Sequence, residues 1–214
     1  MPKDALFIVI EGLDGSGKSS ASKGLMERLE KIYPNKIKRS YEPHNPSCGG
    51  TFIRDVLEKR IPQFDPFVLS LAYAANRLDH NTRIINPWLE QGENHILICD
   101  RYYLSSLVYN SADDFSYDQV MLINKNARKP DIIFFLNVSA AVCQERMDKR
   151  NEPAELFETK LDTYREKYFT AIKYLQQERG QKVIEIDGNL PLEKVIDTLE
   201  KNIFKHFPTW DKRR

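Results

Sequence analysis

The sequence predicts an α/β fold in three layers, with a five-stranded parallel sheet and helices on both of its faces. Five apolar runs alternate along the chain with stretches whose apolar residues recur at helical spacing, and this alternation is typical of parallel sheets. Several runs are continuously apolar, as expected of strands that are covered on both faces. The sequence contains no internal repeat and no low-complexity stretch, so residues 1–214 are expected to form a single domain.

The five runs predict the strands in chain order. "ALFIVIE" is a buried strand, "KIKRSYE" is shorter and more polar, and "HILICD", "DIIFFLNV" and "KVIEID" follow. The strands are therefore expected at 5–11, 36–42, 95–100, 131–138 and 182–187. Ligands of such sheets bind at the carboxyl ends of the strands. This rule places Glu11, Glu42, Asp100 and the turn at 187–189 around one cleft.

Helical patterns fill the segments between the strands. One helix begins near Lys18, directly after the first strand, and another pattern covers 66–91. Two more helices are expected at 158–179 and 191–206, where apolar residues again recur every three or four positions. Strands and helices therefore follow one another along the chain, as crossover connections in a parallel sheet require.

Charge and cysteine content limit the possible partners. A formal net charge of +1 creates no overall field that would attract nucleic acid or an anionic membrane. Cys48, Cys99 and Cys143 are odd in number and widely spaced, which argues against a disulfide framework or a zinc site. The apolar run at 5–10 is far shorter than the roughly 20 residues that span a bilayer. We expect a cytoplasmic protein that binds small molecules.

A glycine-rich turn after the first strand carries the strongest functional signal. Residues 12–19, "GLDGSGKS", match the pattern G-x-x-x-x-G-K-[ST] between a strand and a helix, which predicts a P-loop NTPase fold that binds a nucleoside triphosphate. Lys18 is expected to reach the β- and γ-phosphates as a catalytic residue, and Ser19 to supply a hydroxyl to Mg²⁺. The loop residues expected to contact the nucleotide are Gly12, Leu13, Asp14, Gly15, Ser16, Gly17, Lys18, Ser19 and Ser20.

The remaining sequence favours a small phosphorylated acceptor over water. A GTPase would show N-K-x-D, whereas "NKNA" at 124–127 lies in an apparent helix and lacks the aspartate. The third strand ends with Asp100 and Arg101 instead of the acidic pair typical of motor ATPases. An arginine beside the γ-phosphate suits an incoming anion better than an activated water.

Six segments in order and spacing resemble a known family over nearly the whole chain. They are "IVIEGLDGSGKSS", "EP…GGT" at 42–51, "AYAANRLDH" at 72–80, "DRYYLSSLVYN" at 100–110, "KPDIIFFLNV" at 129–138 and "IDGNLPLEKV" at 187–195. Together they resemble the thymidylate kinases, P-loop nucleoside monophosphate kinases that phosphorylate dTMP to dTDP with ATP and Mg²⁺. The resemblance also implies a homodimer.

The resemblance implies roles for residues around the phosphates and the sugar. Asp14 would hydrogen-bond the 3′-hydroxyl of the acceptor, and Arg101 would bind its phosphate as a catalytic residue. Glu42 and Pro43 would form a turn over that phosphate. Asp100 would hold the Mg²⁺ shell through water.

Other roles implied by the resemblance concern the acceptor base. Tyr73 would stack on the pyrimidine and Arg77 would contact the base edge, one helical turn apart on the same face. Ser106 and Asn110 would read the polar edge of the pyrimidine. Tyr109 would occupy the space that a ribose 2′-hydroxyl needs, favouring deoxynucleotides.

Each assignment has a purely structural alternative. Tyr73 and Tyr109 could be packing residues, Ser106 could bond backbone in its helix, and Asn110 could end it. Arg77 could be a surface charge or pair with Asp79 or Glu90. Asp100 and Arg101 could pair with each other.

The sequence departs from the family at the lid and in the 41–54 segment. Gly15 stands where some members place an arginine, so the resemblance implies a catalytic arginine in a mobile lid around 146–157, for which Arg150 is the prediction. Arg146 and Asn189 are expected to contact ATP. Tyr41, His44 and Arg54 also depart from the usual pattern, which leaves two alternatives open: a kinase for another deoxynucleotide or deoxynucleoside, or an inactive nucleotide-binding relative.

Overall fold

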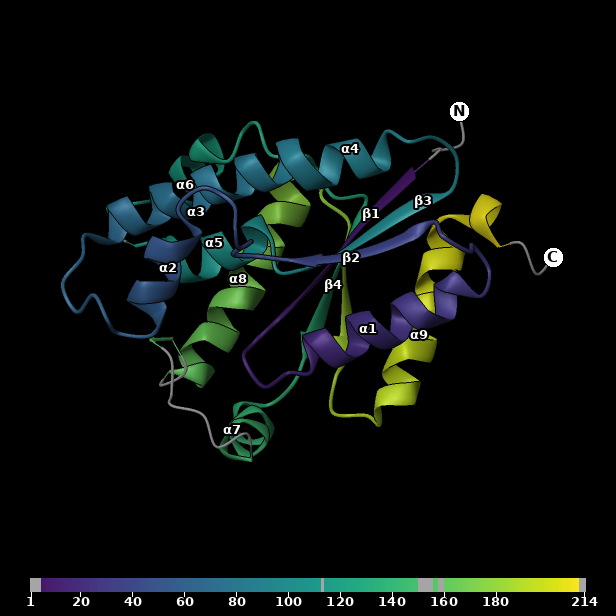
Figure 1. The fold of residues 1–214 in the computed structure, drawn as a ribbon. Helices are drawn as coiled ribbons and strands as arrows, with labels where there is room; N and C mark the ends of the chain where they lie inside the picture. The colour runs from purple at the N-terminus through teal and green to yellow at the C-terminus, as the bar shows by residue number, and fades with distance from the viewer. Residues whose placement is uncertain (1–4, 113, 150–155, 158–159, 212–214) are drawn as a thin grey trace.

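The computed structural model describes residues 5–112, 114–149, 156–157 and 160–211. Its centre is a single sheet of five parallel strands in the order β2-β3-β1-β4-β5 (Figure 1). The strands are β1 (Ala5–Gly12), β2 (Ile37–Tyr41), β3 (His95–Asp100), β4 (Ile132–Asn137) and β5 (Val183–Asp187). The predicted fold class is confirmed, and each predicted strand agrees with the structure to within one residue at either end.

The register of the central strands brings the glycine-rich turn to the end of β3. β1 pairs with β3 from Ala5↔His95 to Ile10↔Asp100, and with β4 up to Gly12↔Leu136. β1 is thus the middle strand, and the chain leaves it beside Asp100. Two segments that are almost 90 residues apart in sequence therefore lie side by side at the carboxyl ends of the strands.

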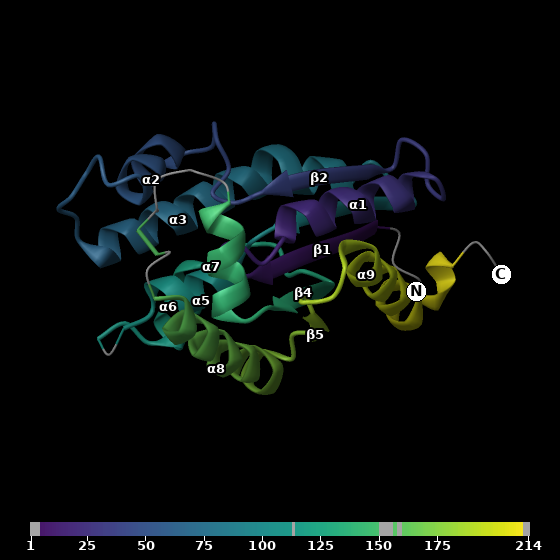
Figure 2. The ribbon, with the colours of Figure 1, turned by 90° about the horizontal axis from the view of Figure 1, so that it is seen from below.

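Helices cover both faces of the sheet because alternate strand residues point to opposite sides. Leu6, Ile8 and Ile10 pack in one buried cluster with the inner faces of α1 (Lys18–Glu30) and α9 (Leu192–His206). Phe7 and Val9 pack in a second cluster on the other face. Figures 1 and 2 show α1 and α9 together on one side of the sheet.

The second cluster is covered chiefly by α5 (Tyr103–Asn110) and α8 (Leu161–Arg179). The predicted helix at 66–91 is a continuous helical segment made of α3 (Pro66–His80), a π-helical turn (Asn81–Ile85) and α4 (Asn86–Leu89). The predicted helix at 158–179 starts at Leu161 among the described residues, and 158–159 lie outside them.

Four shorter helical segments were not predicted individually. They are α2 (Gly50–Leu57), α6 (Tyr117–Ile123), α7 (Ala140–Asp148) and the 3₁₀ turn Pro208–Trp210. The expectation that "NKNA" at 124–127 lies in a helix is wrong, because α6 ends at Ile123 and these residues form the turn after it. None of the helices in the described ranges is long and apolar enough to cross a membrane.

A third apolar cluster lies away from the sheet and supports the segment around α2. Ile53, Val56 and Leu57 of α2 pack against Leu69 of α3, and Tyr73 lies at the margin of this cluster. α2 and the first half of α3 therefore form a small packed unit that extends beyond the sheet (Figure 2).

The core packing leads to a stability prediction. Phe134 of β4 is fully buried, so Phe134→Ala should lower the free energy of unfolding by about 3–5 kcal/mol. Leu190→Ala, at a side chain that is 43% exposed, is the control and should change it by less than about 0.5 kcal/mol. Urea unfolding of the two variants measures both values, and similar losses would contradict this description of the core.

Candidate functional site

The loop between β1 and α1 requires glycine at two positions for steric reasons. Gly15 and Gly17 have φ values of 77° and 88°, in the left-handed region that other residues avoid. A Cβ on Gly15 would also lie 2.3 Å from the Cys143 carbonyl oxygen of α7. The backbone therefore curves tightly between Leu13 and Lys18, and α1 begins directly behind it with its N-terminus towards the loop.

Lys18 lies in the mouth of this loop. Its Nζ donates to the carbonyl oxygens of Gly12 at 3.0 Å and Leu13 at 2.6 Å, and is 3.8 Å from Asp14 Oδ1. Burial, together with the nearby positive charge of Arg101, lowers the pKa of Lys18 to about 8. A phosphate anion would stabilise the charged ammonium that burial disfavours.

Two adjoining cavities open at the carboxyl ends of the strands. The cavity at the glycine-rich loop is called the donor-side cavity, after the ATP that the sequence predicts there. It has a volume of about 380 Å³, and its lining residues are Asp14, Gly15, Gly17, Lys18, Ser19, Ser20, Arg39, Tyr41, Glu42, Asp100 and Arg101. The second cavity is called the acceptor-side cavity, after the acceptor that the sequence predicts there. It has a volume of about 240 Å³, and its lining residues are Asp14, Glu42, Pro43, Arg54, Leu57, Tyr73, Arg77, Arg101, Tyr102, Ser105, Ser106, Tyr109, Asn110 and Phe157. Asp14, Glu42 and Arg101 belong to both, so the cavities meet there.

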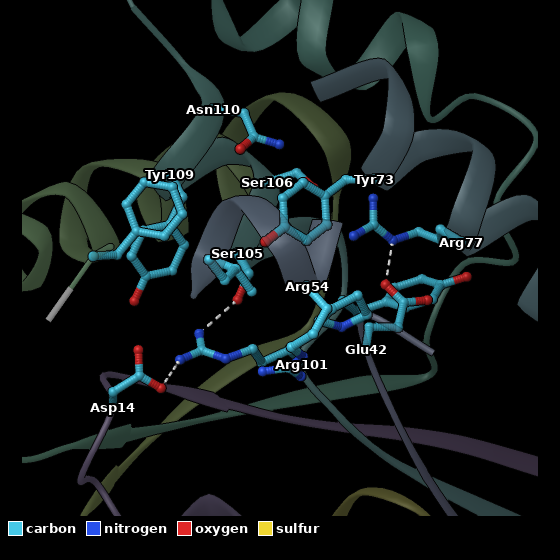
Figure 3. A pocket seen from close by; sticks show the side chains of 14 residues that line it. Asp14, Glu42, Arg54, Tyr73, Arg77, Arg101, Ser105, Ser106, Tyr109 and Asn110 are labelled. Atoms are coloured by element: carbon cyan, nitrogen blue, oxygen red, sulfur yellow. Dashed lines mark hydrogen bonds and ion pairs between the residues drawn. The ribbon is translucent and has the colours of Figure 1, made fainter. Parts of the chain in front are cut away.

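Arg101 is the cation at the junction of the cavities. Its Nη2 is 2.5 Å from Asp14 Oδ1, and its Nη1 is bonded to Ser105 Oγ at 3.1 Å and Tyr168 Oη at 3.2 Å. Figure 3 shows the guanidinium reaching from β3 towards Asp14 with Tyr109 nearby. The guanidinium carbon is 5.4 Å from the centre of the Tyr109 ring, a cation–π distance.

Asp100 does not pair with Arg101, so that structural alternative is wrong. Asp100 Oδ2 accepts from Arg39 Nη2 at 2.5 Å, and Arg39 Nε donates to Ser22 Oγ at 2.6 Å. Asp100 Oδ1 is buried and has no hydrogen-bond partner among the described residues. Because buried carboxylate oxygens normally have partners, this atom is suited to a water of a metal ion's hydration shell.

A buried ion pair forms one wall of the acceptor-side cavity. Arg77 is 2% exposed and its Nε donates to Glu42 Oε2 at 2.7 Å, while Nη1 donates to Asn124 Oδ1. The alternatives for Arg77 are therefore wrong: it is not a surface charge, and Asp79 and Glu90 have other partners, Arg83 and Arg128. Figure 3 shows the pair beside Tyr73.

The structure brings most of the residues predicted to bind the acceptor into the lining of this cavity. This holds whether they bind the acceptor or only pack there. Tyr73 is half-buried on α3, whereas Ser106 and Asn110 are buried on the facing side of α5. Tyr109 packs against Phe157 with ring centres 5.1 Å apart. Their positions around one cavity are compatible with the predicted contacts, and the contacts themselves stay predictions.

Several predicted residues are not part of the lining of either cavity. Glu11 does not line the cleft as expected, because its side chain is fully buried behind the loop. Asn189 does not belong to the lining of either cavity and bonds to Asp187. Arg146 donates to the carbonyl oxygens of Ser16 at 3.4 Å and Gly188 at 3.3 Å, so it lies against the loop.

The prediction for the lid falls partly outside the structure. Arg150 and residues 151–155 lie outside the described residues. Arg39 is a site residue that sequence reasoning missed, as are Leu57, Tyr102, Ser105 and Phe157 of the acceptor-side cavity. Arg39 directly follows Lys38 in a short polar strand, where the sequence gives no sign that its side chain reaches the end of β3.

Fold and site together define a P-loop protein with two cavities that meet at Arg101. Residues 10–199 match the sequence profile of the family described as Thymidylate kinase. The chain is 35% identical to a probable thymidylate kinase of Staphylothermus marinus, over 95% of this chain and 96% of that protein. It is 33% identical to the thymidylate kinase of Ureaplasma parvum serovar 3, over 96% and 92%. The chain belongs to the thymidylate kinase family of nucleoside monophosphate kinases.

The buried pair of Arg77 and Glu42 should contribute more to the free energy of folding than an exposed ion pair does. Glu42→Ala leaves the Arg77 guanidinium buried without a carboxylate, which should cost about 3–5 kcal/mol of folding free energy. Glu145→Ala removes the exposed partner of Lys149 and should cost less than about 1 kcal/mol. Denaturant titrations of both variants test the difference, which would be absent if Arg77 were solvated.

Proposed function

We propose that this chain transfers the γ-phosphate of ATP to dTMP, giving dTDP. Membership of the thymidylate kinase family and the names of its relatives support this proposal. The structural observation that supports it best is the meeting of two cavities at Arg101. One cavity contains the P-loop and the other contains aromatic and polar groups suited to a pyrimidine nucleotide.

ATP would occupy the donor-side cavity. The backbone N–H groups of residues 12–20 and the positive end of α1 would bind the phosphates, and Lys18 would turn from the Gly12 and Leu13 carbonyl oxygens to the β- and γ-phosphates. Arg146, which already contacts the loop, would lie over the nucleotide, and Asn189 remains a predicted contact.

The residues at the end of β3 fit a magnesium ion. Ser19 is an exposed residue that lines the donor-side cavity, and Asp100 Oδ1 is buried there without a partner among the described residues. These two groups would hold Mg²⁺, Asp100 through water. When bound, the ion supplies charge neutralisation and orientation of the phosphates. Arg39 keeps the Asp100 carboxylate in place from its other oxygen.

dTMP would occupy the acceptor-side cavity. Arg101 would bind its phosphate, and Asp14 would accept a hydrogen bond from the 3′-hydroxyl. Tyr73 would stack on the base while Ser106 and Asn110 read its polar edge. Tyr109 would exclude a 2′-hydroxyl.

Further contacts of the acceptor concern its base edge and phosphate. Arg77 would contact the base edge from the pair that it forms with Glu42. Glu42 and Pro43 would border the phosphate. Arg54 lines the same cavity and adds a positive charge, whereas His44 stacks on His80 with ring centres 4.3 Å apart and is not part of either lining.

Charge cancellation is the main catalytic requirement of this reaction. Two polyanions must approach in line, so positioning and neutralisation dominate the transfer. Lys18 and Arg101 would flank the transferred group, with Arg150 of the lid around 146–157 as the predicted third cation. Asp14 lies 2.5 Å from Arg101 and neutralises it, and the incoming phosphate would take over that role.

A comparison of acceptors tests the proposed function. With ATP as donor, dTMP should give the highest kcat/KM among dTMP, dUMP, dGMP and thymidine. A higher kcat/KM for another acceptor would contradict the assignment of dTMP as the substrate. Release of ADP that does not depend on any acceptor would contradict the kinase assignment.

Two substitutions separate the donor and acceptor roles. Lys18→Ala should remove turnover while the far-ultraviolet circular dichroism stays unchanged. Arg101→Ala should weaken dTMP binding by about 10–100-fold, since it removes a hydrogen bond between charged groups, and should change ATP binding by less than about threefold. Calorimetric titration with dTMP and with ADP measures both, and equal losses would contradict the role of Arg101.

We also propose that the chain forms a homodimer in the cytoplasm. An apolar stripe on α3 supports the dimer: Phe67, Leu71 and Leu78 are 46%, 42% and 43% exposed, and α6 beside it exposes Leu122. The double variant Leu71→Glu/Leu78→Glu should halve the mass measured by light scattering, whereas Leu190→Glu should not. A wild-type protein that is monomeric at micromolar concentration would contradict the dimer.

A further inference from the structure

A buried carboxylate links the P-loop strand to the turn that carries Arg101. Glu11 is the penultimate residue of β1 and is fully buried. Its Oε1 accepts from the backbone N–H groups of Tyr102 at 2.8 Å and Ser105 at 3.0 Å. Its Oε2 accepts from Ser105 Oγ at 2.7 Å and Tyr168 Oη at 3.2 Å. Burial raises the pKa of Glu11, while Arg101 and these donors oppose the shift.

The backbone bonds fix the first turn of α5. The helix starts at Tyr103, and Tyr102 at its N-cap makes no side-chain capping bond, so the Glu11 carboxylate accepts from N–H groups that a capping residue usually satisfies. Arg101, just before this turn, has a φ of 67°. A non-glycine residue keeps this left-handed conformation only where its surroundings enforce it.

The side-chain bonds continue from Glu11 to the guanidinium of Arg101. Ser105 Oγ and Tyr168 Oη each donate towards Glu11 and each accept from Arg101 Nη1, at 3.1 and 3.2 Å. Tyr168 Oη also lies 3.2 Å from the Gly12 carbonyl oxygen. Both hydroxyls therefore bridge the end of β1 and Arg101.

Ligand binding would make these bridges necessary. Arg101 is also held by Asp14, but Asp14 is assigned to the acceptor sugar. Once Asp14, the partner of Nη2, turns to the sugar, Ser105 and Tyr168 still accept from Nη1. Their orientation is set by Glu11.

We propose that Glu11, acting through the hydroxyls of Ser105 and Tyr168, is a positioning residue that holds Arg101 against the acceptor phosphate. Tyr168 is a second positioning residue. It is fully buried and is not part of the lining of either cavity, so it acts on the acceptor only through lining residues that it contacts. These are Arg101, to which its hydroxyl is bonded, Ser105, and Tyr109, whose ring centre is 6.1 Å away. The inference rests on the proposed function and adds residues that hold its acceptor arginine.

Tyr168→Phe is the cleanest test because it deletes only the hydroxyl. It should weaken dTMP binding and lower kcat/KM for dTMP about tenfold, the scale of a hydrogen bond to a charged group. ADP binding should change by less than about twofold. Tyr33→Phe is the matched control: Tyr33 is also buried and its hydroxyl donates to a backbone carbonyl, of Trp210, away from both cavities. It should leave both affinities unchanged.

A double-mutant cycle separates positioning from a general structural role. In an Arg101→Ala background, Tyr168→Phe should have no further effect on dTMP affinity, because its effect passes through the missing guanidinium. Glu11→Gln, which keeps the shape of the side chain, should give a loss of dTMP affinity of at least the same size and the same dependence on Arg101.

The outcomes distinguish this inference from the proposed function. Equal losses of dTMP and ADP affinity, an unchanged dTMP affinity in Tyr168→Phe, or a full effect of Tyr168→Phe in the Arg101→Ala background would overturn the positioning role. A wild-type protein that neither binds nor phosphorylates dTMP would instead overturn the proposed function. If Glu11→Gln fails to fold, the cycle with Tyr168→Phe still decides.

Discussion

The parallel pairing of β1 with β3 is the constraint on which the rest of the site depends. Since Ile10 lies opposite Asp100, the loop that follows β1 and the Asp100–Arg101 turn that follows β3 emerge side by side. The loop presents Lys18 and backbone N–H groups, and the turn presents one carboxylate and one guanidinium. A shift of this register would separate the two halves of the site while leaving each segment locally intact.

The site brings several cations together, and nearby acids balance their charge. Arg101 is paired with Asp14 and Arg39 with Asp100, while Lys18 lies on backbone carbonyl oxygens. Like charges in a partly dehydrated cleft repel each other strongly, and these partners offset the repulsion. Local pairing therefore reconciles a strongly charged site with a net charge of +1.

The sequence was informative where short-range pattern decides the structure, and less so where partners come from distant segments. The strands and the phosphate loop were predictable because continuous apolar runs and a strand–glycine-loop–helix pattern have few alternatives. Arg77 could not be paired correctly, because Glu42 is 35 residues away and nearer acids were equally available. Glu11 was misplaced because the rule that strand ends form the cleft does not say which way a side chain points.

The sequence by itself determined the fold class, the phosphate loop and the family, since these depend on periodicity and on motifs whose residues lie close together in the chain. Only the tertiary structure decided which charges are satisfied. It turned Glu11 inward to the start of α5, joined Arg39 to Asp100, and left one Asp100 oxygen without a partner among the described residues. The physical reason is that hydrogen bonds and ion pairs act over about 3 Å, and such distances between remote segments exist only after the sheet has formed.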